Sequence, residues 1–355
     1  MVPYCMAMYR QSMTDYGAPL EAMEAPTPAP EGSQVLVRVS HCGVCHSDIH
    51  LHDGYFELGD GKRLDVRAGR ALPFTLGHEI AGTVEAAGPE AGDVDVTRPY
   101  AVYPWMGCGS CRRCLAGDEH LCATTHHLGI TVDGGYASHV LVPHPRYLID
   151  ISGLSPELAG SFMCSGVTAY SAVRKVLPYL DGGALLIVGL GGVGMMGLSI
   201  ARALTDGTIV AADIDPAKRQ AALEAGAAHV FDPAAHESRK AVFKACGAVA
   251  AAIDFAGAES SFNFAQSVVG KAGAVAVVGL IGGKLSMALP MLPLRQLAIL
   301  GCFVGSIPEA RALVDLARSG RLSTIPIATR PLAEADMALA DLRAGRVLGR
   351  LVLTP

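Results

Sequence analysis

Four cysteines lie close together in the middle of the first half of the chain, at the spacing Cys-x2-Cys-x2-Cys-x7-Cys. Four thiolates on one short loop, with no open position, suit a structural zinc ion in tetrahedral coordination. An iron–sulfur cluster is the alternative. However, the third spacing is longer than in the ferredoxin motif, and Ala123 rather than proline follows the last cysteine. We therefore predict a zinc ion that stabilises the loop and performs no chemistry, bound by Cys108, Cys111, Cys114 and Cys122.

A second set of metal-binding side chains is spread over a much longer stretch of sequence. Cys45 begins a polar run that contains Asp48, His78 precedes a glutamate, and Cys164 is separate from both. Two thiolates and one imidazole form a known ligand set for a catalytic zinc, which keeps a fourth position for water or substrate. Asp48 would orient the His78 ring through its other nitrogen. Each residue alone is more often structural, so the prediction depends on their joint presence beside a dinucleotide-binding motif.

The glycines Gly189, Gly191 and Gly194 fit the pattern GxGxxG. A continuous apolar run precedes them and a helical pattern follows, as in a strand–turn–helix dinucleotide site, where the pyrophosphate meets the helix N-terminus. Asp213 stands near the end of the next strand, where it would bind the adenosine ribose and repel a 2′-phosphate. The sequence therefore predicts NAD rather than NADP. The alternative is a glycine-rich packing turn followed by an ordinary strand-end aspartate.

The elements that must position these residues fall into two groups. Strand patterns at 35–40, 80–86 and 136–142 indicate an irregular β-rich region. From about residue 166, apolar strands alternate with helices, which is typical of parallel βαβ units. The strands are expected at 184–188, 209–212, 249–253 and 274–278, and the helices at 193–204, 216–226, 260–269, 308–319 and 332–344.

This pattern predicts an α/β protein of three parts. Residues 1–165 would form a β-rich catalytic domain that carries the four-cysteine loop. Residues 166–305 would form an NAD-binding domain with a Rossmann-type, doubly wound parallel sheet. Residues 306–355 would return to the first domain.

Composition excludes several classes of protein. The net charge is −5, with 17% charged and 51% hydrophobic residues, which excludes a disordered chain and argues against nucleic-acid binding. The uncharged stretch 182–201 is long enough for a membrane span, but its glycines favour a strand, a tight turn and a helix. Residues 1–10 lack the pattern of a secretory signal, so we expect the cytoplasm, where thiols stay reduced.

The whole chain resembles a zinc-dependent alcohol dehydrogenase of the medium-chain dehydrogenase/reductase superfamily. The resemblance implies a GroES-like fold for the β-rich domain, NAD as cofactor, and two zinc ions per chain, one catalytic and one structural. It also implies reversible oxidation of a primary or secondary alcohol to an aldehyde or ketone, in a homo-oligomer that is a dimer or a tetramer. The matching motifs are Gly43-Val44-Cys45-His46-Ser47-Asp48, Gly77-His78-Glu79, the four-cysteine loop, Gly166-Val167-Thr168-Ala169-Tyr170, Gly189-Leu190-Gly191-Gly192-Val193-Gly194 and Gly349-Arg350.

The resemblance also assigns roles to single residues. Cys45, His78 and Cys164 would bind the catalytic zinc, with the Glu79 carboxylate close behind it. Ser47 would take the proton of the alcohol, and His50 would end a relay to solvent through the cofactor ribose. The cofactor site would contain His46 on the phosphates, Thr168 near the nicotinamide, Arg350 on the pyrophosphate, and also Gly189, Gly191, Gly192, Val193, Gly194, Asp213 and Lys218.

Trp105 and Tyr55 would line the substrate pocket together with Ser47. For Tyr55 the alternative is packing within a surface loop, and for His50 it is a solvent-facing position. In one respect the chain departs from the family: His78 follows Cys45 by an unusually long interval. The additional residues, around 57–69, would form either a lid or rim at the pocket mouth or a solvated loop, and their charge favours the loop.

Other functions stay open at this point. A relative that acts on a polyol, a cyclic alcohol or an aryl alcohol would share these motifs. A zinc-free reductase of the same superfamily would lack both cysteine-containing sets. A non-catalytic NAD(H)-binding regulator would not need the open ligand set.

Overall fold

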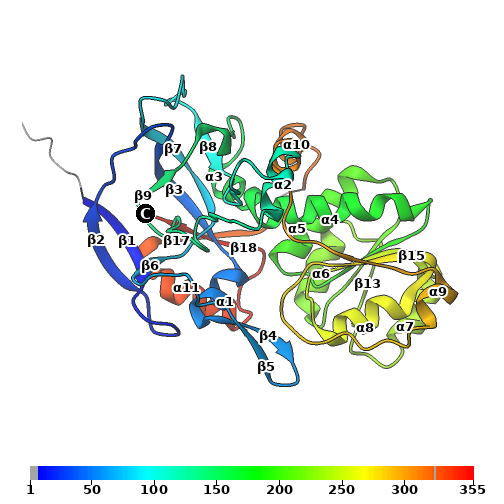
Figure 1. Cartoon of the computed structure of the whole chain (residues 1–355). Helices are drawn as coiled ribbons and strands as arrows, with labels where there is room; N and C mark the ends of the chain where they lie inside the picture. Colours follow the sequence, from blue (N-terminus) through cyan, green and yellow to red (C-terminus); the bar gives the residue numbers. More distant parts are fainter. Residues whose placement is uncertain (1–6, 324) are drawn as a thin grey trace, which may run out of the picture.

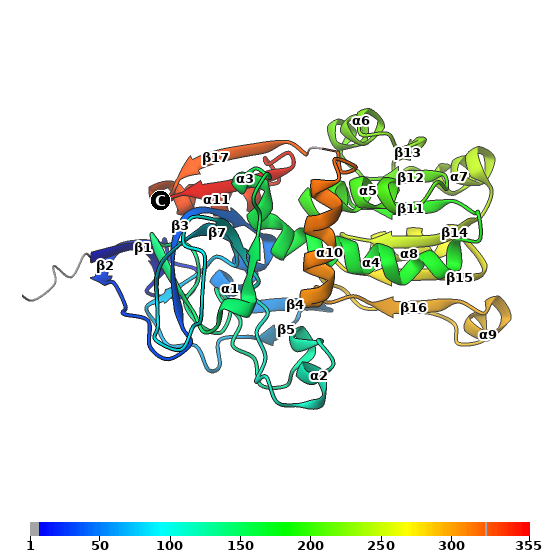
Figure 2. The same cartoon turned by 90° about the horizontal axis from the view of Figure 1, so that it is seen from above.

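The computed structural model describes residues 7–323 and 325–355. Its two halves lie side by side: a β-rich half that includes the C-terminus, and a half in which helices surround a parallel sheet (Figures 1 and 2). The expectation for residues 1–10 rests largely on residues 1–6, which lie outside the described part of the chain. No described helix is long and apolar enough to cross a membrane.

The β-rich half is built around a seven-stranded sheet that combines strands from the first 150 residues with two from the C-terminal segment. Its strand order is β10-β8-β7-β3-β18-β17, and β9 also pairs with β3. The bounds are β3 Val35–Val44, β7 Glu79–Ala87, β8 Pro99–Val102, β9 His139–Val142, β10 Leu148–Asp150, β17 Ile327–Pro331 and β18 Arg350–Thr354. A smaller sheet contains β1 Ala7–Met13, β2 Glu21–Pro26 and β6 Phe74–Thr75.

Short helices connect these strands and carry much of the site. They are α1 His46–Asp53, α2 Arg112–Leu115, α3 Pro156–Ala159 and α11 Ala335–Arg343, with single 3₁₀ turns at Glu119–Leu121, Pro145–Tyr147, Gly160–Met163 and Leu332–Glu334. The helix expected at 332–344 is therefore divided into a 3₁₀ turn and α11.

The second half contains a six-stranded, fully parallel sheet with the order β13-β12-β11-β14-β15-β16. Its strands are β11 Leu185–Val188, β12 Ile209–Ala212, β13 His229–Phe231, β14 Val249–Asp254, β15 Val269–Val277 and β16 Ala298–Gly301. Its helices are α4 Ser165–Leu180, α5 Gly192–Leu204, α6 Pro216–Glu224, α7 Ser238–Cys246, α8 Glu259–Val268, α9 Met291–Arg295 and α10 Ile307–Arg318.

The central strand of this sheet explains why its sequence is apolar throughout. All four residues of β11 are buried, and alternate residues belong to two different hydrophobic cores, one on each face of the sheet. A strand covered on both faces has no polar side, so its sequence does not alternate. The chain order also reverses beside β11, which confirms the doubly wound fold and places a crevice at the carboxyl ends of β11 and β14.

The predicted domain boundaries fall at two junctions between elements. Residue 165 begins α4, and residue 305 lies two positions before α10, the helix between the two halves in Figure 2. These boundaries stay predictions.

Two expectations need correction. The strand expected at 136–142 begins only at His139, because the backbone of Tyr136 bonds to Gln11 and Leu76, and Ala137 forms an isolated bridge with Arg10 of β1. The segment around 57–69 also differs: residues 55–65 form an ordered hairpin of β4 Tyr55–Gly59 and β5 Lys62–Asp65, although most of its side chains are exposed.

The hairpin turn follows from its sequence. Asp60 and Gly61 both have a positive φ, as in the two-residue turns that match the twist of paired strands, and Asp-Gly is a typical sequence for such a turn. The charged residues of the segment favoured the prediction of a solvated loop, although Asp60-Gly61 is a turn sequence.

The hairpin reaches across to the half that contains the parallel sheet (Figure 1). Asp60 accepts a hydrogen bond from Lys284, at 2.7 Å. A Cβ atom built at Gly282 would lie 2.5 Å from the carbonyl oxygen of Glu57, so the two backbones are in close contact. The exposed ion pair contributes little by itself, and the backbone contact is what joins the hairpin to the 279–283 loop.

The glycine turn permits a prediction about folding. A Cβ at Gly194 would lie 1.8 Å from the carbonyl oxygen of Gly189, whereas a Cβ at Gly191 would meet no atom within 4 Å. We expect Gly194→Ala to lower the free energy of unfolding by about 1–3 kcal/mol. The measurement is urea denaturation, with Gly191→Ala as the matched control. Equal stability of the two variants would contradict this account of the turn.

Candidate active site

A cleft of about 720 Å³ between the two halves collects most of the residues that the sequence singles out. Its walls come from the end of β3, the start of α1, the start of α4, the glycine turn and the end of β12. Predicted residues that line it are Cys45, His46, Ser47, His50, Trp105, Cys164, Thr168, Gly189, Gly191, Gly192, Val193, Gly194, Asp213, Lys218 and Arg350.

Of the residues predicted for the catalytic, cofactor and substrate sites, three do not line this cleft. His78 and Glu79 are fully buried and adjoin it through Cys45 and Cys164. Tyr55 lies on the hairpin, where the Arg63 guanidinium stacks 3.8 Å from its ring centroid. This position fits the alternative of local packing.

The predicted catalytic ligands converge although they are far apart in sequence. Donor atoms of Cys45, His78, Glu79 and Cys164 all lie within 4.8 Å of one another, and the two sulfurs are 4.0 Å apart. Two sulfurs bound to one tetrahedral zinc at 2.3 Å would be separated by about 3.8 Å. The Nε2 atom of His78 is buried and has no hydrogen-bond partner. The residues present therefore fit a zinc ion.

The sheet explains how these residues meet. Cys45 follows the last residue of β3, and His78 precedes the first residue of β7, and the two strands pair with Gly43 opposite Glu79. The adjacent ends of two antiparallel strands thus place the thiol and the imidazole together. Cys164 arrives from the other side, between the 3₁₀ turn that precedes α4 and α4 itself.

Asp48 holds this arrangement together. It is fully buried, and one carboxylate oxygen lies 3.1 Å from Nδ1 of His78, which turns Nε2 of the ring toward the sulfurs. The other oxygen accepts hydrogen bonds from the backbone N–H of Cys45, at 2.9 Å, and from the Tyr136 hydroxyl, at 3.1 Å. The sequence indicated Asp48 but not Tyr136, which has no spacing signal.

The charges around the sulfurs favour a thiolate. A hydrogen bond from the Cys164 thiol lowers the pKa of Cys45 well below its ordinary value, against the opposing effect of burial, and His78 lowers it further. Behind them, Arg350 forms a buried ion pair with Glu79. Arg350 also lies against Gly192, so it contacts both the metal-binding set and the glycine turn.

The glycine turn is shaped to admit a backbone-bound phosphate. Gly189 has a φ of 84°, and Gly191 precedes α5 with open space on its Cα. Asp213, at the end of β12, accepts a hydrogen bond from the N–H of Leu190 at 2.7 Å and from that of Asp215 at 2.9 Å. These contacts fix the carboxylate at the edge of the cleft, beside the glycine turn.

The four-cysteine loop forms a second compact set of sulfurs. Cys111 Sγ lies 3.5 Å from Cys114 Sγ and 3.7 Å from Cys122 Sγ, and Cys108 Sγ lies 3.9 Å from Cys114 Sγ. These separations bracket the roughly 3.8 Å expected around one zinc ion. Hydrogen bonds from Ser110 lower the pKa of Cys108 to about 6, which favours its thiolate.

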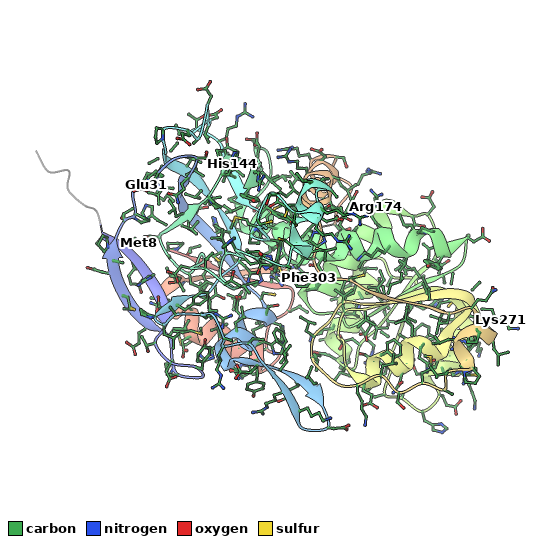
Figure 3. The ribbon with its side chains drawn as sticks, viewed as in Figure 1. Met8, Glu31, His144, Arg174, Lys271 and Phe303 are labelled. Atoms are coloured by element: carbon green, nitrogen blue, oxygen red, sulfur yellow. The ribbon has the colours of Figure 1, made fainter. Side chains whose placement is uncertain are left out.

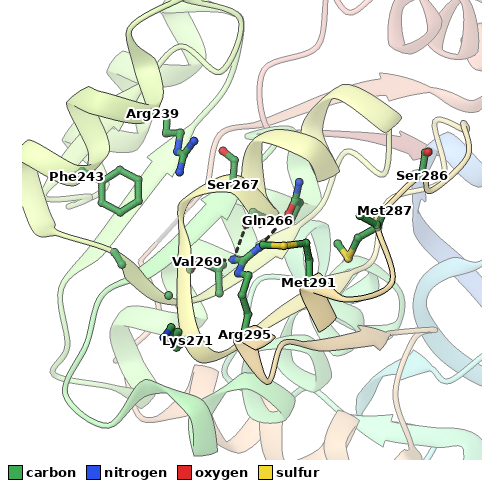
Figure 4. A pocket seen from close by; sticks show the side chains of 13 residues that line it. Arg239, Phe243, Gln266, Ser267, Val269, Lys271, Ser286, Met287, Met291 and Arg295 are labelled. Carbon is green, nitrogen blue, oxygen red and sulfur yellow. Dashed lines mark hydrogen bonds between the residues drawn. The ribbon is translucent and has the colours of Figure 1, made fainter. Parts of the chain in front are cut away.

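A second cavity, of about 570 Å³, lies at the far end of the parallel-sheet half, beside α9 (Figure 4). Its Arg295 donates hydrogen bonds to the side chain and the carbonyl oxygen of Gln266 and to the carbonyl oxygen of Val269. This cavity contains none of the predicted site residues.

Sequence reasoning did not find several residues in and around the larger cleft. Leu121, His120 and Phe303 line the cleft, and His127 contacts the rings of Trp105 and Phe303. Figure 3 labels Phe303 between the two halves. His120 and His127 belong to no ligand motif, so no spacing signal could have identified them.

Known proteins resemble this chain over nearly its full length. The family description "Alcohol dehydrogenase GroES-like domain" matches residues 31–153, and "Zinc-binding dehydrogenase" matches residues 192–319. An NAD-dependent alcohol dehydrogenase of Sulfurisphaera tokodaii is 37% identical, over 98% of this chain and 100% of that protein. A D-arabinose 1-dehydrogenase (NADP(+)) of Saccharolobus solfataricus is 30% identical, over 96% and 95%.

Among solved structures, the alcohol dehydrogenase of Aeropyrum pernix superimposes with a TM-score of 0.88 at 30% identity, covering 98% of this chain and 100% of that one. The similarity spans both halves and the cleft between them. The chain therefore belongs to the zinc-dependent alcohol dehydrogenases of the medium-chain dehydrogenase/reductase superfamily.

Proposed function

We propose that the cleft oxidises primary or secondary alcohols reversibly to aldehydes or ketones, in keeping with an NAD-linked alcohol dehydrogenase. The observation that carries the proposal is the unpartnered Nε2 of His78 beside two thiols, in the wall of a cleft that also contains the glycine turn. Polyols, cyclic alcohols and aryl alcohols remain candidate substrates. A non-catalytic NAD(H)-binding regulator is the alternative of another class.

We propose two zinc ions per chain. Cys45, His78 and Cys164 would hold the catalytic ion, with Glu79 close behind, and the four cysteines Cys108, Cys111, Cys114 and Cys122 would hold the structural ion. A bound catalytic zinc lowers the pKa of a coordinated hydroxyl and polarises a carbonyl. Thiols that bind metal must stay reduced, which supports a cytoplasmic location.

Ser47 and His50 are the proposed proton relay. Both residues belong to α1 and line the cleft, where the ribose of a bound cofactor would connect them. Burial, followed by the nearby His46, lowers the pKa of His50. His50 is therefore neutral near pH 7 and able to accept the proton that Ser47 passes on.

The cofactor residues are proposed from the same cleft. The N-terminus of α5 favours the pyrophosphate, with His46 and Arg350 as cationic or hydrogen-bonding partners nearby. Asp213 would bind the adenosine ribose, with Lys218 lining the cleft near it, and Thr168 at the start of α4 would pack near the nicotinamide.

Association with a second copy of the chain is supported by the edge of the parallel sheet. In the described part of the chain, β16 is the last strand of the sheet and offers free backbone groups on its outer side. The segment that leads into β16 carries four exposed apolar side chains, those of Leu285, Leu289, Met291 and Leu294. We propose that this face forms the interface of a dimer, alone or within a tetramer.

The function is tested by Cys45→Ala in an assay with ethanol, benzyl alcohol and cyclohexanol. The wild type should reduce NAD and contain two zinc ions per chain. The variant should lose one zinc and at least about 1,000-fold in kcat/KM, because the Lewis acid is lost. Binding of NADH, measured by fluorescence, should be unchanged.

Cys42→Ala is the matched control, because Cys42 is equally buried but lies outside the donor set. It should keep both zinc ions and its activity. A wild type that holds two zinc ions and oxidises none of the alcohols would favour the regulator, and an active Cys45→Ala variant would refute the assigned zinc site.

Cofactor choice is tested by Asp213→Gly. Removal of the carboxylate removes both the ribose partner and the repulsion of a 2′-phosphate, so the preference for NAD over NADP should fall at least about tenfold in kcat/KM. Zinc content should not change. An unchanged preference would remove Asp213 from this role.

The cysteine loop is tested by Cys111→Ser. We expect the loss of one zinc ion and a melting temperature lower by several degrees, since the loop loses its metal cross-link. Cys246→Ser is the control, because Cys246 is half-buried and far from any donor set. A variant with wild-type melting temperature and two zinc ions would refute the structural site.

A further inference from the structure

The four-cysteine loop also contributes part of the wall of the larger cleft. His120 and Leu121 line the cleft, they belong to the 3₁₀ turn Glu119–Leu121, and Cys122 follows them directly. Trp105 also lines the cleft and lies shortly before the first of the four cysteines. We call Trp105, His120 and Leu121 the loop-side wall. The loop therefore shapes the cleft in addition to holding four thiols.

Leu121 offers an apolar contact inside the cleft. It lines the cleft and is 45% exposed, and Phe303, from the half with the parallel sheet, is 46% exposed and lines the same cleft. Exposed apolar side chains that gather in a cleft are typical of a surface that binds an apolar group. The apolar part of a bound alcohol would cover some of this surface.

Glu119, the first residue of the 3₁₀ turn, is held by a buried cluster of hydrogen bonds. Its side chain is only 5% exposed. One carboxylate oxygen accepts hydrogen bonds from the N–H of Gly107 at 3.1 Å, from the Tyr147 hydroxyl at 2.7 Å and from the Arg146 guanidinium at 3.2 Å. A buried carboxylate is costly unless it is hydrogen-bonded and paired, so these contacts fix the place of the turn.

This carboxylate connects the two segments that form the loop-side wall. Gly107 lies two residues after Trp105, and Glu119 lies directly before the other two wall residues. A Cβ atom built at Gly107 would lie 3.0 Å from the carbonyl oxygen of Glu119, so the two backbones are also in contact. Trp105 itself is fixed, because its Nε1 donates a hydrogen bond to the carbonyl oxygen of Met163 at 2.7 Å.

The side-chain partners of Glu119 are anchored outside the four-cysteine loop. The carbonyl oxygen of the buried Tyr147 accepts a hydrogen bond at 2.8 Å from the N–H of Tyr103, directly after β8. The carbonyl oxygen of Arg146 accepts a hydrogen bond from Arg311 of α10 at 3.3 Å. Burial raises the pKa of Tyr147 to about 12, so its hydroxyl stays protonated and can donate near pH 7. Glu119 therefore joins the loop to the rest of the protein without the use of the cysteines.

We propose that Glu119 is a positioning residue, which holds the loop-side wall against the cleft and thereby sets selectivity for the apolar part of the alcohol. Alcohols with a ring would gain from contact with Leu121, and a displaced turn would lose that contact. The four-cysteine loop then influences the choice of substrate, although its proposed zinc performs no chemistry. This inference rests on the proposed function and deepens it at the same cleft.

The test compares kcat/KM for benzyl alcohol with that for ethanol in the wild type, Leu121→Ala, Glu119→Ala and Glu119→Gln. Leu121→Ala should lower the benzyl-to-ethanol ratio about tenfold, because benzyl alcohol has a ring that can contact the wall and ethanol has none. Glu119→Ala should lower the ratio to a similar extent, mainly by raising KM for benzyl alcohol. Glu119→Gln keeps an acceptor oxygen, so it should keep most of the wild-type ratio.

Asp118→Asn is the matched control, because Asp118 is the adjacent acidic residue and its carboxylate forms an exposed ion pair with Arg113 at 3.6 Å. It should keep the ratio and the zinc content of the wild type. A wild-type ratio in Leu121→Ala or in Glu119→Ala would overturn the proposal, and so would an equal loss in Asp118→Asn.

Tyr147→Phe provides the test should Glu119→Ala release zinc. It removes one hydrogen bond to the carboxylate and keeps the buried ring, so the zinc content should not change. The benzyl-to-ethanol ratio should fall about threefold, because Glu119 is then held by fewer donors. An unchanged ratio in this variant would likewise overturn the proposal.

A second measurement does not depend on turnover. Trp105 is the only tryptophan in the chain and is 2% exposed, so quenching of its fluorescence by acrylamide reports on the loop-side wall. Glu119→Ala should raise the quenching constant at least about twofold, whereas Asp118→Asn should leave it unchanged. If no alcohol is oxidised but the quenching constant rises, the proposed function fails and the positioning by Glu119 stands. If alcohols are oxidised but neither the ratio nor the quenching constant changes, the reverse holds.

Discussion

The site depends on one buried carboxylate. Asp48 is fully buried and holds three groups from three parts of the chain: the backbone of Cys45, the ring of His78 and the hydroxyl of Tyr136. Buried charges are costly unless they are hydrogen-bonded. The same bonds that satisfy Asp48 also set the orientation of the imidazole, so stability and function share one network. Without this carboxylate, the backbone of Cys45 and the ring of His78 would no longer be held by one common group.

The cleft is created by the meeting of two different folds. The β-rich half supplies the metal-binding residues at the ends of adjacent strands, and the parallel sheet supplies a glycine turn at the point where its strand order reverses. Arg350 contacts both, through Glu79 on one side and Gly192 on the other. The hairpin of β4 and β5 adds a second bridge, through close backbone contact at Gly282. The two halves are thus joined at two separate places.

The aromatic residues of the cleft lie outside the motifs that define the family. The proposed zinc ligands and the glycine turn account for the proposed class of reaction, and they leave the choice of alcohol to the residues around them. Here those residues include Trp105, Phe303 and His120, and the His127 ring packs against Trp105.

The amino-acid sequence by itself determined the local elements and the chemistry that depends on near neighbours. The parallel strands, the glycine turn, the cap at Asp215 and the four-cysteine loop are all encoded within short segments, where period, spacing and turn residues act directly. The Asp-Gly turn of the hairpin was encoded too, but the surrounding charge favoured a loop. The set of Cys45, His78 and Cys164 was predicted from their residue types beside a dinucleotide-binding motif and from the resemblance, because no local pattern joins residues so far apart. Tertiary structure alone decided that Tyr136 supports Asp48, that Tyr55 packs on Arg63, and that His120 lines the cleft. These contacts join residues that are distant in sequence. Their importance depends on burial, which no local sequence pattern reports.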